Sequence, residues 1–243
     1  MKYAIIAAGE GSRLASEGIE EPKPLVKICG ERLIDRLIRV FMDNGATEIV
    51  VICNDMAKQV ARHLEELRQN GLDGQHVPLR FVVKTTAGSM HSFYEICRYL
   101  EDDVFCLTTV DTVFREEDFS RYIKELCRLA ETGEADGLMG VTGFVDDEKP
   151  LFVGADAQMD INGFYDTQSG CRFVSGGIYG LDKGAVKILR QCMADGVTRM
   201  RDFQRALVSG GQKLRAYEFG KILDIDHAGD IAAAERFLNG GEA

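Results

Sequence analysis

The stretch Lys2–Leu14, which reads KYAIIAAGEGSRL, decides the fold of this chain. Tyr3–Ala7 is an apolar run with the length of a buried strand. Gly9 and Gly11 follow directly, and glycines allow a tight turn that brings backbone amides close to a phosphate. By itself such a loop is equally compatible with a simple turn. A strand that leads into a glycine loop therefore indicates, as a first hypothesis, an α/β protein that handles phosphate compounds.

Two cations accompany the glycine loop. A dinucleotide-binding fingerprint needs a third glycine where Leu14 stands, and the chain has no Gly-Lys-Ser or Gly-Lys-Thr of a Walker loop. What remains is a loop that carries Arg13, followed by Lys23 between Pro22 and Pro24. Because prolines fix the backbone on both sides, they can aim the lysine at small entropic cost. The alternative is an extended surface connector with an incidental lysine.

The hydrophobic pattern predicts one mixed α/β domain. Apolar runs alternate with stretches of helical period in the first half, which is typical of βα units around a mainly parallel sheet. After about residue 130, strand-like pieces joined by Gly and Asp turns indicate a small β elaboration. The expected strands are Tyr3–Ala7, Ile49–Cys53, Leu79–Val83, Val104–Val110, Leu138–Phe144, Leu151–Ala155, Ile161–Tyr165, Phe173–Leu181 and a strand pair in Leu214–Ile225, and the expected helices cover about 33–44, 57–69, 89–100, 119–130, 185–193, 200–209 and 228–238.

Composition and charge exclude several classes of protein. The chain has 243 residues, of which 45% are hydrophobic and 28% charged, as in ordinary globular proteins. It contains 29 Lys and Arg and 39 Asp and Glu, so its net charge is -10. Because this charge repels polyanions, neither nucleic acid nor an anionic membrane is an expected partner. The charge of a phosphate substrate must then be met locally, by placed cations, backbone amides and a metal ion.

The cysteines and the amino end indicate a cytoplasmic protein. Seven cysteines are widely spaced without a Cys-x-x-Cys pair, and we interpret them as reduced residues of the core. The apolar run at Met1–Ala8 is too short for a signal peptide or a membrane anchor. Four histidines show no metal-ligand spacing and no Gly-x-Ser-x-Gly elbow is present, which disfavours a zinc enzyme or a serine hydrolase.

Two aspartates are candidate metal ligands. Asp111 follows the apolar run Val104–Val110, at the carboxyl end of a predicted central strand, where open α/β sheets bind ligands. It could instead cap the helix that begins near Glu116, although it lies several residues early for that role. In Asp224-Ile225-Asp226 the alternation of a strand would place both carboxylates on one face, with Asp226 alternatively the N-cap of the last helix.

These residues together resemble the sugar-nucleotide pyrophosphorylases, which are nucleotidyltransferases. The resemblance implies a single Rossmann-like α/β domain over residues 1–243, with a nucleotide-binding part of about 1–115 and an acceptor-binding elaboration of about 137–226. It further implies transfer of a nucleoside monophosphate from a nucleoside triphosphate to a phosphorylated small molecule, usually a sugar 1-phosphate, with release of pyrophosphate. The motifs that carry it are Ala7-Ala8-Gly9-x-Gly11-Ser12-Arg13-Leu14, Pro22-Lys23-Pro24-Leu25-Val26 and Gly30-x-x-Leu33-Ile34.

The family's site residues can be carried over to this chain one by one. Asp111 and Asp226 match its ligands of Mg2+, the usual cofactor of this chemistry, although Val110 replaces the glycine that commonly precedes the first. Arg13, Lys23 and Asp111 are the implied catalytic residues. The nucleotide would be bound by Ala8, Gly9, Gly11, Ser12 and Arg13, together with Gly88 and Ser89 of the loop Thr85–Ser89, where Ser89 or Thr86 could alternatively cap a helix.

The acceptor side departs from the family pattern. Gly177 and Tyr179 match the family's Gly-Ile-Tyr, but Ser175 replaces its Asn. The family's Glu-Lys-Pro follows the segment that here is Met159–Phe164, whereas Glu148-Lys149-Pro150 precedes it, so the role of phosphate-binding lysine is not carried to Lys149. The cations that could replace that lysine are Arg172 and Lys221.

Several functions stay open at this point. The acceptor could be phosphocholine or a related phosphoamine, used by a cytidylyltransferase. Relatives of this fold can also be regulatory or assembly subunits that bind a nucleotide without catalysis. A glycosyltransferase would need an Asp-x-Asp pair, and Asp111-Thr112-Val113 lacks it. The base, the acceptor and the oligomeric state are not readable from the sequence.

Overall fold

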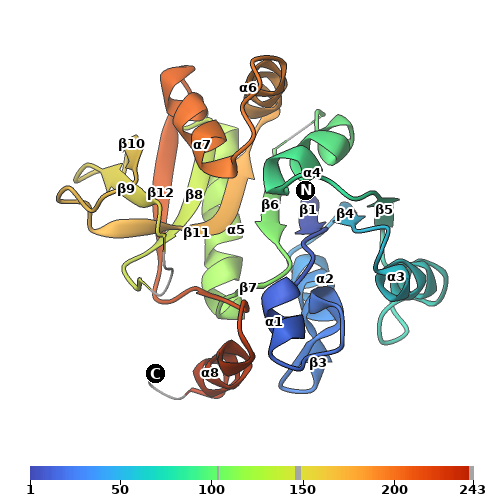
Figure 1. Ribbon diagram of the computed structural model, residues 1–243. Helices are drawn as coiled ribbons and strands as arrows, with labels where there is room; N and C mark the ends of the chain where they lie inside the picture. Colours follow the sequence, from blue (N-terminus) through green and yellow to red (C-terminus); the bar gives the residue numbers. More distant parts are fainter. Residues whose placement is uncertain (103, 146–148, 241–243) are drawn as a thin grey trace.

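A nine-stranded sheet forms the centre of the molecule in this computed structural model, which describes residues 1–102, 104–145 and 149–240. β1 (Lys2–Ala7) pairs in parallel with β4 (Glu48–Cys53) and with β6 (Phe105–Thr109), and β4 pairs in parallel with β5 (Leu79–Val83). All four strands therefore end at the same edge, where the glycine loop begins (Figure 1). The predicted mixed sheet with parallel βα units is confirmed.

The second half of the chain extends the same sheet. β11 (Phe173–Leu181) runs antiparallel to β6 and also pairs with β8 (Gly137–Thr142) and β9 (Phe152–Ala155). β10 (Ile161–Tyr165) pairs with β9, and β12 (Leu214–Phe219) pairs in parallel with β8. The expectation of a strand pair within Leu214–Ile225 is wrong, because β13 (Leu223–Asp224) pairs instead with β7 (Thr112–Val113). This places the last strand beside Asp111.

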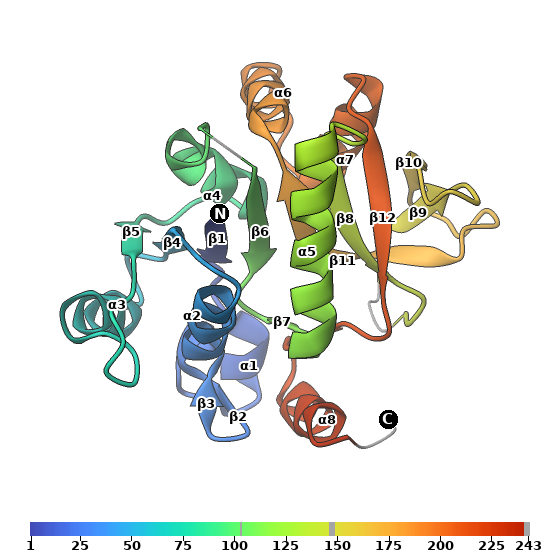
Figure 2. The same cartoon turned by 180° about the vertical axis from the view of Figure 1, so that it is seen from behind.

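Helices cover both faces of the sheet. Successive residues of β1 enter different cores: Tyr3 and Ile5 pack on one face, and Ala4 and Ile6 on the other. One face packs against α2, α3, α5 and α8, and the opposite face against α4, α6 and α7 (Figures 1 and 2). The helices are α1 (Ser12–Ser16), α2 (Leu33–Asp43), α3 (Lys58–Asn70), α4 (Ser89–Ile96), α5 (Glu116–Thr132), α6 (Lys183–Ala194), α7 (Met200–Ser209) and α8 (Ala228–Leu238).

Short elements complete the chain. Two 3-10 turns cover Lys23–Leu25 and Cys97–Tyr99, and β2 (Lys27–Ile28) pairs with β3 (Glu31–Arg32). The helix expected over 89–100 becomes a 3-10 turn for its last part, as helix ends often do. Across the described ranges, no helix has the length and apolar content needed to cross a membrane.

Candidate active site

Lys23 is the meeting point of two carboxylates that lie far apart in the chain. It begins the 3-10 turn Lys23–Leu25, after Pro22 in an extended conformation and before Pro24. Its side chain is buried, with 9% of the residue exposed. Lys23 Nζ lies 2.5 Å from Asp111 Oδ2 and 2.8 Å from Asp226 Oδ1. The two prolines thus place an ammonium that binds residues 88 and 203 positions away.

The end of β6 positions Asp111. Val110 N donates to Ile6 O at 3.0 Å, which extends the strand pairing by one residue. The hydroxyls of Thr109 and Thr112 lie 2.8 Å apart across the turn that contains Asp111. The N-cap of α5 is Arg115, so Asp111 is not the cap of that helix. Its carboxylate is directed instead toward Lys23.

The start of α8 positions Asp226. Ile225 N donates to the Asp111 carbonyl at 3.1 Å, which ties the two acidic segments together. The N-cap of α8 is His227, and Asp230 within the first turn accepts from Asp226 N at 2.9 Å and from His227 N at 2.6 Å, as in a capping box. The alternative that Asp226 is the N-cap is therefore wrong. Its carboxylate binds Lys23 and also Arg13 Nη1, at 3.0 Å.

Gly11 is needed for two reasons. Its φ of +62° lies in the left-handed region, which favours glycine. A Cβ at this position would lie 3.2 Å from Lys23 Cβ, so a side chain would crowd the lysine. Gly11 also begins α1, which carries Arg13 toward Asp226. A side chain at residue 11 would therefore strain the backbone and push against the Lys23 turn.

The charges of this cluster influence one another. Burial alone would lower the pKa of Lys23, but Asp111 and Asp226 raise it above its ordinary value. Burial would raise the pKa of Asp226, yet its hydrogen bond to Lys23 and the charges of Lys23 and Arg13 hold it below its usual range. Desolvation, followed by the charges of Asp111 and Asp226, raises the pKa of Asp224 to about 7. The three carboxylates therefore influence one another, while the hydrogen bonds from Lys23 and Arg13 reach Asp111 and Asp226.

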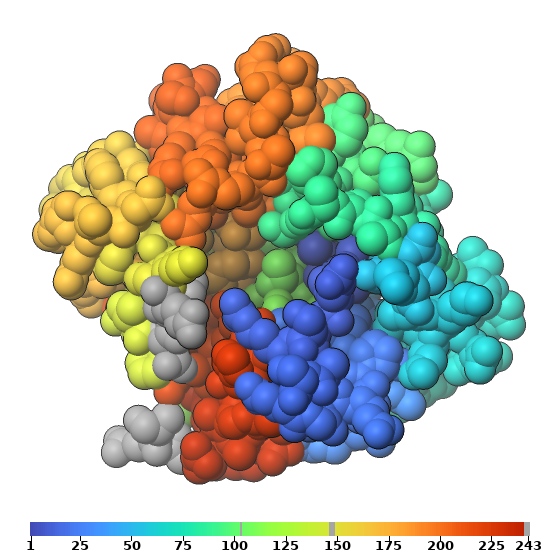
Figure 3. Space-filling model, viewed as in Figure 1, coloured from blue at the N-terminus to red at the C-terminus, as the bar shows by residue number. Residues whose placement is uncertain are grey.

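A cavity of about 510 Å³ opens beside this cluster, and the glycine loop and the loop before α4 form its walls. Gly88 is the N-cap of α4, and Thr86 Oγ1 lies 2.6 Å from Ser92 Oγ within the same wall. The face in Figure 3 is hollowed at its centre, next to the blue amino-terminal segment. All residues that the sequence predicted to bind the nucleotide line this cavity: Ala8, Gly9, Gly11, Ser12, Arg13, Gly88 and Ser89.

A second cavity of about 460 Å³ shares Arg13 and Asp226 with the first. Gly177 and Tyr179, the predicted acceptor residues, are not among the described residues that line it. Gly177, with a φ of +72°, lies in the irregular part of β11 next to Thr112, and Tyr179 is buried in the core. The residues that do line the cavity include Thr142, Phe144, Ser175, Gly176, Asp224 and Arg201.

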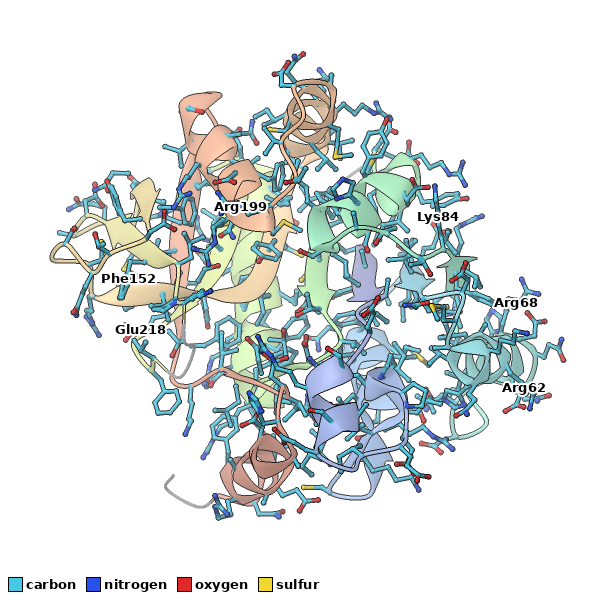
Figure 4. All side chains as sticks on the ribbon, viewed as in Figure 1. Arg62, Arg68, Lys84, Phe152, Arg199 and Glu218 are labelled. Atoms are coloured by element: carbon cyan, nitrogen blue, oxygen red, sulfur yellow. The ribbon has the colours of Figure 1, made fainter. Side chains whose placement is uncertain are left out.

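The cations of the second cavity differ from those expected. Arg172 pairs at 2.7 Å with Glu218 of β12, which is labelled in Figure 4, and Lys221 Nζ lies 3.8 Å from the centre of the Phe144 ring. Lys149 and Arg201 line the cavity instead, and Arg201 donates to the Lys149 carbonyl at 2.9 Å. Glu148, the first residue of that motif, lies outside the described residues. No local motif marks Arg201, because its position depends on how α7 packs.

The cluster has the donors that a magnesium ion requires. Within the described residues, no group of three or more His, Cys, Asp and Glu side chains is placed to hold a metal ion. Asp111 Oδ2 and Asp226 Oδ1 nevertheless both contact Lys23 Nζ, at 2.5 and 2.8 Å. The two oxygens therefore lie no farther apart than the sum of these two distances. Mg2+ is usually bound by one or two carboxylates, with water and substrate phosphates completing its shell. The two aspartates fit this donor set.

The chain is similar to known proteins in both sequence and structure. The chain is 24% identical over 252 residues to the bifunctional IPC transferase and DIPP synthase of Rubrobacter xylanophilus, covering 99% of this chain and 52% of that protein. The chain thus spans about half the length of this relative. An inositol-1-phosphate CTP transferase from T. maritima has a TM-score of 0.74 at 19% identity and covers 100% of this chain and 98% of the other.

A second solved structure agrees in fold. It comes from Bacillus anthracis, was assigned as a glucose-1-phosphate thymidylyltransferase, and has a TM-score of 0.83 at 18% identity, covering 100% of this chain and 97% of the other. The family model of the MobA-like NTP transferase domain matches residues 3–176, which include the glycine loop, Lys23 and Asp111. This match extends over more than half of the sequence. The chain therefore belongs to the family of MobA-like NTP transferase domains.

Proposed function

We propose that this protein transfers a nucleoside monophosphate from a nucleoside triphosphate to a phosphorylated, hydroxylated small molecule, such as a sugar 1-phosphate or an inositol phosphate. The observation that carries the proposal is the cluster of Arg13, Lys23, Asp111 and Asp226 on the wall between two cavities. One cavity has the glycine loop of a triphosphate site, and the other offers room for an acceptor. The names of the relatives support the same class of reaction.

The reaction needs no nucleophile from the protein. An oxygen of the acceptor phosphate attacks the α-phosphorus of the triphosphate, and the bond to pyrophosphate breaks. The protein must hold two polyanions in line and neutralise the charge that spreads over the transferred group. Arg13 lies on both cavities, and Lys23 lies on the nucleotide side, so both cations are placed for this task. The amides of the glycine loop would add hydrogen bonds to phosphate oxygens.

Asp111 and Asp226 would hold Mg2+, which supplies positive charge to the triphosphate and the leaving pyrophosphate when it is bound. The same two carboxylates now hold the Lys23 ammonium. A protein that only binds a nucleotide for regulation has no need of two acidic and two basic groups in contact. This supports an enzyme over a regulatory subunit.

The second cavity favours a hydroxylated acceptor over phosphocholine. Among the described lining residues, Phe144 is the one Phe, Tyr or Trp, and the Lys221 ammonium already lies 3.8 Å from the centre of its ring. A quaternary ammonium is usually bound by the faces of several aromatic rings. Asp224, Ser175 and Thr142 instead provide oxygens that can bind hydroxyl groups.

The test is a pyrophosphate-release screen of the four common ribonucleoside triphosphates with Mg2+. Each is paired with sugar 1-phosphates, inositol 1-phosphate and phosphocholine, and matched acceptors without the phosphate are the negative controls. We expect one triphosphate to react with one hydroxylated acceptor phosphate. Turnover with phosphocholine alone would move the assignment to the phosphoamine class. Binding of a triphosphate without turnover of any pair would favour the regulatory alternative.

A further inference from the structure

The short helix α1 is weakly anchored in the protein. Among its five residues, all of them described, Leu14 alone is buried. Helices of this length are not stable by themselves, so contacts outside the helix must hold it. Because Gly11 is the N-cap of α1, any tilt of the helix would move the glycine loop that lines the nucleotide cavity.

Two side chains join α1 to the segment that carries Asp226. Arg13, on the first turn, donates to Asp226 Oδ2 at 3.0 Å, but its side chain is 58% exposed, and salt weakens such a contact. Glu17 directly follows the helix. Its Oε1 lies 2.6 Å from His227 Nδ1, and its Oε2 accepts from Ala228 N at 2.7 Å.

The Glu17 contact reaches backbone as well as side chain. Asp230 accepts from the amides of Asp226 and His227, and Glu17 accepts from the next amide, that of Ala228. The carboxylate of Glu17 thus lies at the amino end of α8, where the helix dipole favours negative charge. The side chain of Glu17 thus contacts residues that lie 210 and 211 positions further along the chain.

We propose that Glu17 is a positioning residue that fixes the segment of Asp226 against the glycine loop and so prepares the site for a triphosphate with Mg2+. This inference rests on the proposed function. Glu17 lines neither described cavity, so it acts through its neighbours and not by touching a substrate. Without it, binding of the nucleotide must also order α1, and that entropy cost weakens affinity.

Two variants and one control test this role. Glu17→Ala removes both hydrogen bonds, and we expect the Kd of the Mg2+-bound triphosphate to rise roughly tenfold, as loss of a partly exposed charged contact implies. Glu17→Gln keeps an oxygen for Ala228 N but loses the charge beside His227, so its effect should be roughly threefold. Glu20→Gln is the matched control, since Glu20 is an exposed acid on the same loop. Calorimetry with each of the four common triphosphates gives the affinities.

Amide hydrogen exchange of the nucleotide-free protein provides a readout that does not depend on substrate. In Glu17→Ala we expect faster amide exchange at Ala228 and in the glycine loop, with unchanged exchange in β1 and an unchanged Tm. In turnover assays, the KM for the triphosphate should rise more than kcat falls. Unchanged affinity and unchanged exchange would overturn the inference. So would a lower Tm with faster exchange throughout the core, which indicates a merely structural role. If the wild type binds no triphosphate, the proposed function fails, while amide exchange still tests whether Glu17 holds the Asp226 segment against the glycine loop.

Discussion

Replacing Asp111 with asparagine separates a catalytic aspartate from a structural one. The carboxylate now shares the Lys23 ammonium with Asp226 at 2.5 and 2.8 Å. Asparagine keeps an oxygen that can accept from Lys23, and Asp226 stays in place. Desolvation and then the charge of Asp111 raise the pKa of Asp224, so removal of the Asp111 charge also relieves repulsion with Asp224. The free energy of unfolding should therefore change by about 1 kcal/mol or less, which is a Tm shift of at most about 4 °C for a chain of this size.

Turnover should respond far more strongly. Asp111 is one of the two carboxylates that would hold Mg2+ beside the triphosphate, and loss of one preorganised electrostatic contact lowers kcat by up to roughly a thousandfold. Pyrophosphate release measures turnover, and scanning calorimetry without nucleotide measures Tm. Asp43→Asn is the control, because Asp43 is 62% exposed and pairs with Arg39 at 3.6 Å on α2. Turnover within threefold of wild type would refute the reasoning, and a Tm loss above about 10 °C would assign Asp111 a structural role.

Gly11→Ala should destabilise the nucleotide-free protein by about 1–2 kcal/mol, because the φ of Gly11 is positive. Gly9→Ala is the control and should leave Tm unchanged, because a Cβ at Gly9 would meet no atom within 4 Å. Equal Tm values for the two variants would contradict this prediction. Glu116→Gln should lower the free energy of unfolding by about 0.5–1 kcal/mol at pH 7, because hydrogen bonds from Arg39 lower the pKa of Glu116 in the folded protein. Urea titrations should show that this difference between the variant and the wild type disappears as the pH falls below 4.5 and through the native pKa. Removal of divalent ions with EDTA should abolish pyrophosphate release and added Mg2+ should restore it; full turnover in excess EDTA would exclude the proposed metal.

Much of the fold could be predicted because its elements have strong local signals. Leu79–Val83, Ile161–Tyr165, Phe173–Leu181 and Met200–Ser209 have the predicted bounds, since their apolar patterns end at turn residues. The five residues of α1 are too few to show a helical period, so that helix was missed. The pairing of β12 with β8 depends on packing between residues about 77 positions apart, which no local pattern records.

The residues of the candidate site also differ in whether a local sequence pattern predicts them. Glycines, prolines and a strand end mark Gly11, Lys23 and Asp111 locally, so sequence reasoning could name them. That the Lys23 ammonium donates to both Asp111 and Asp226 depends on tertiary packing, which only the structure shows. Arg201 carries no local signal, because an arginine at the start of a helix is ordinary until the helix is packed. Their roles in catalysis stay predictions until turnover is measured.

The distance in sequence between Lys23 and Asp226 has a consequence for biosynthesis. A nascent chain that has emerged from the ribosome through β11 already contains the strands that bury most of β1, yet it lacks Asp226. The carboxylate that completes the cluster lies 45 residues beyond the end of β11, so it emerges later than those strands. The strands beside β1 can therefore pair during translation before Asp226 emerges to bind the Lys23 ammonium.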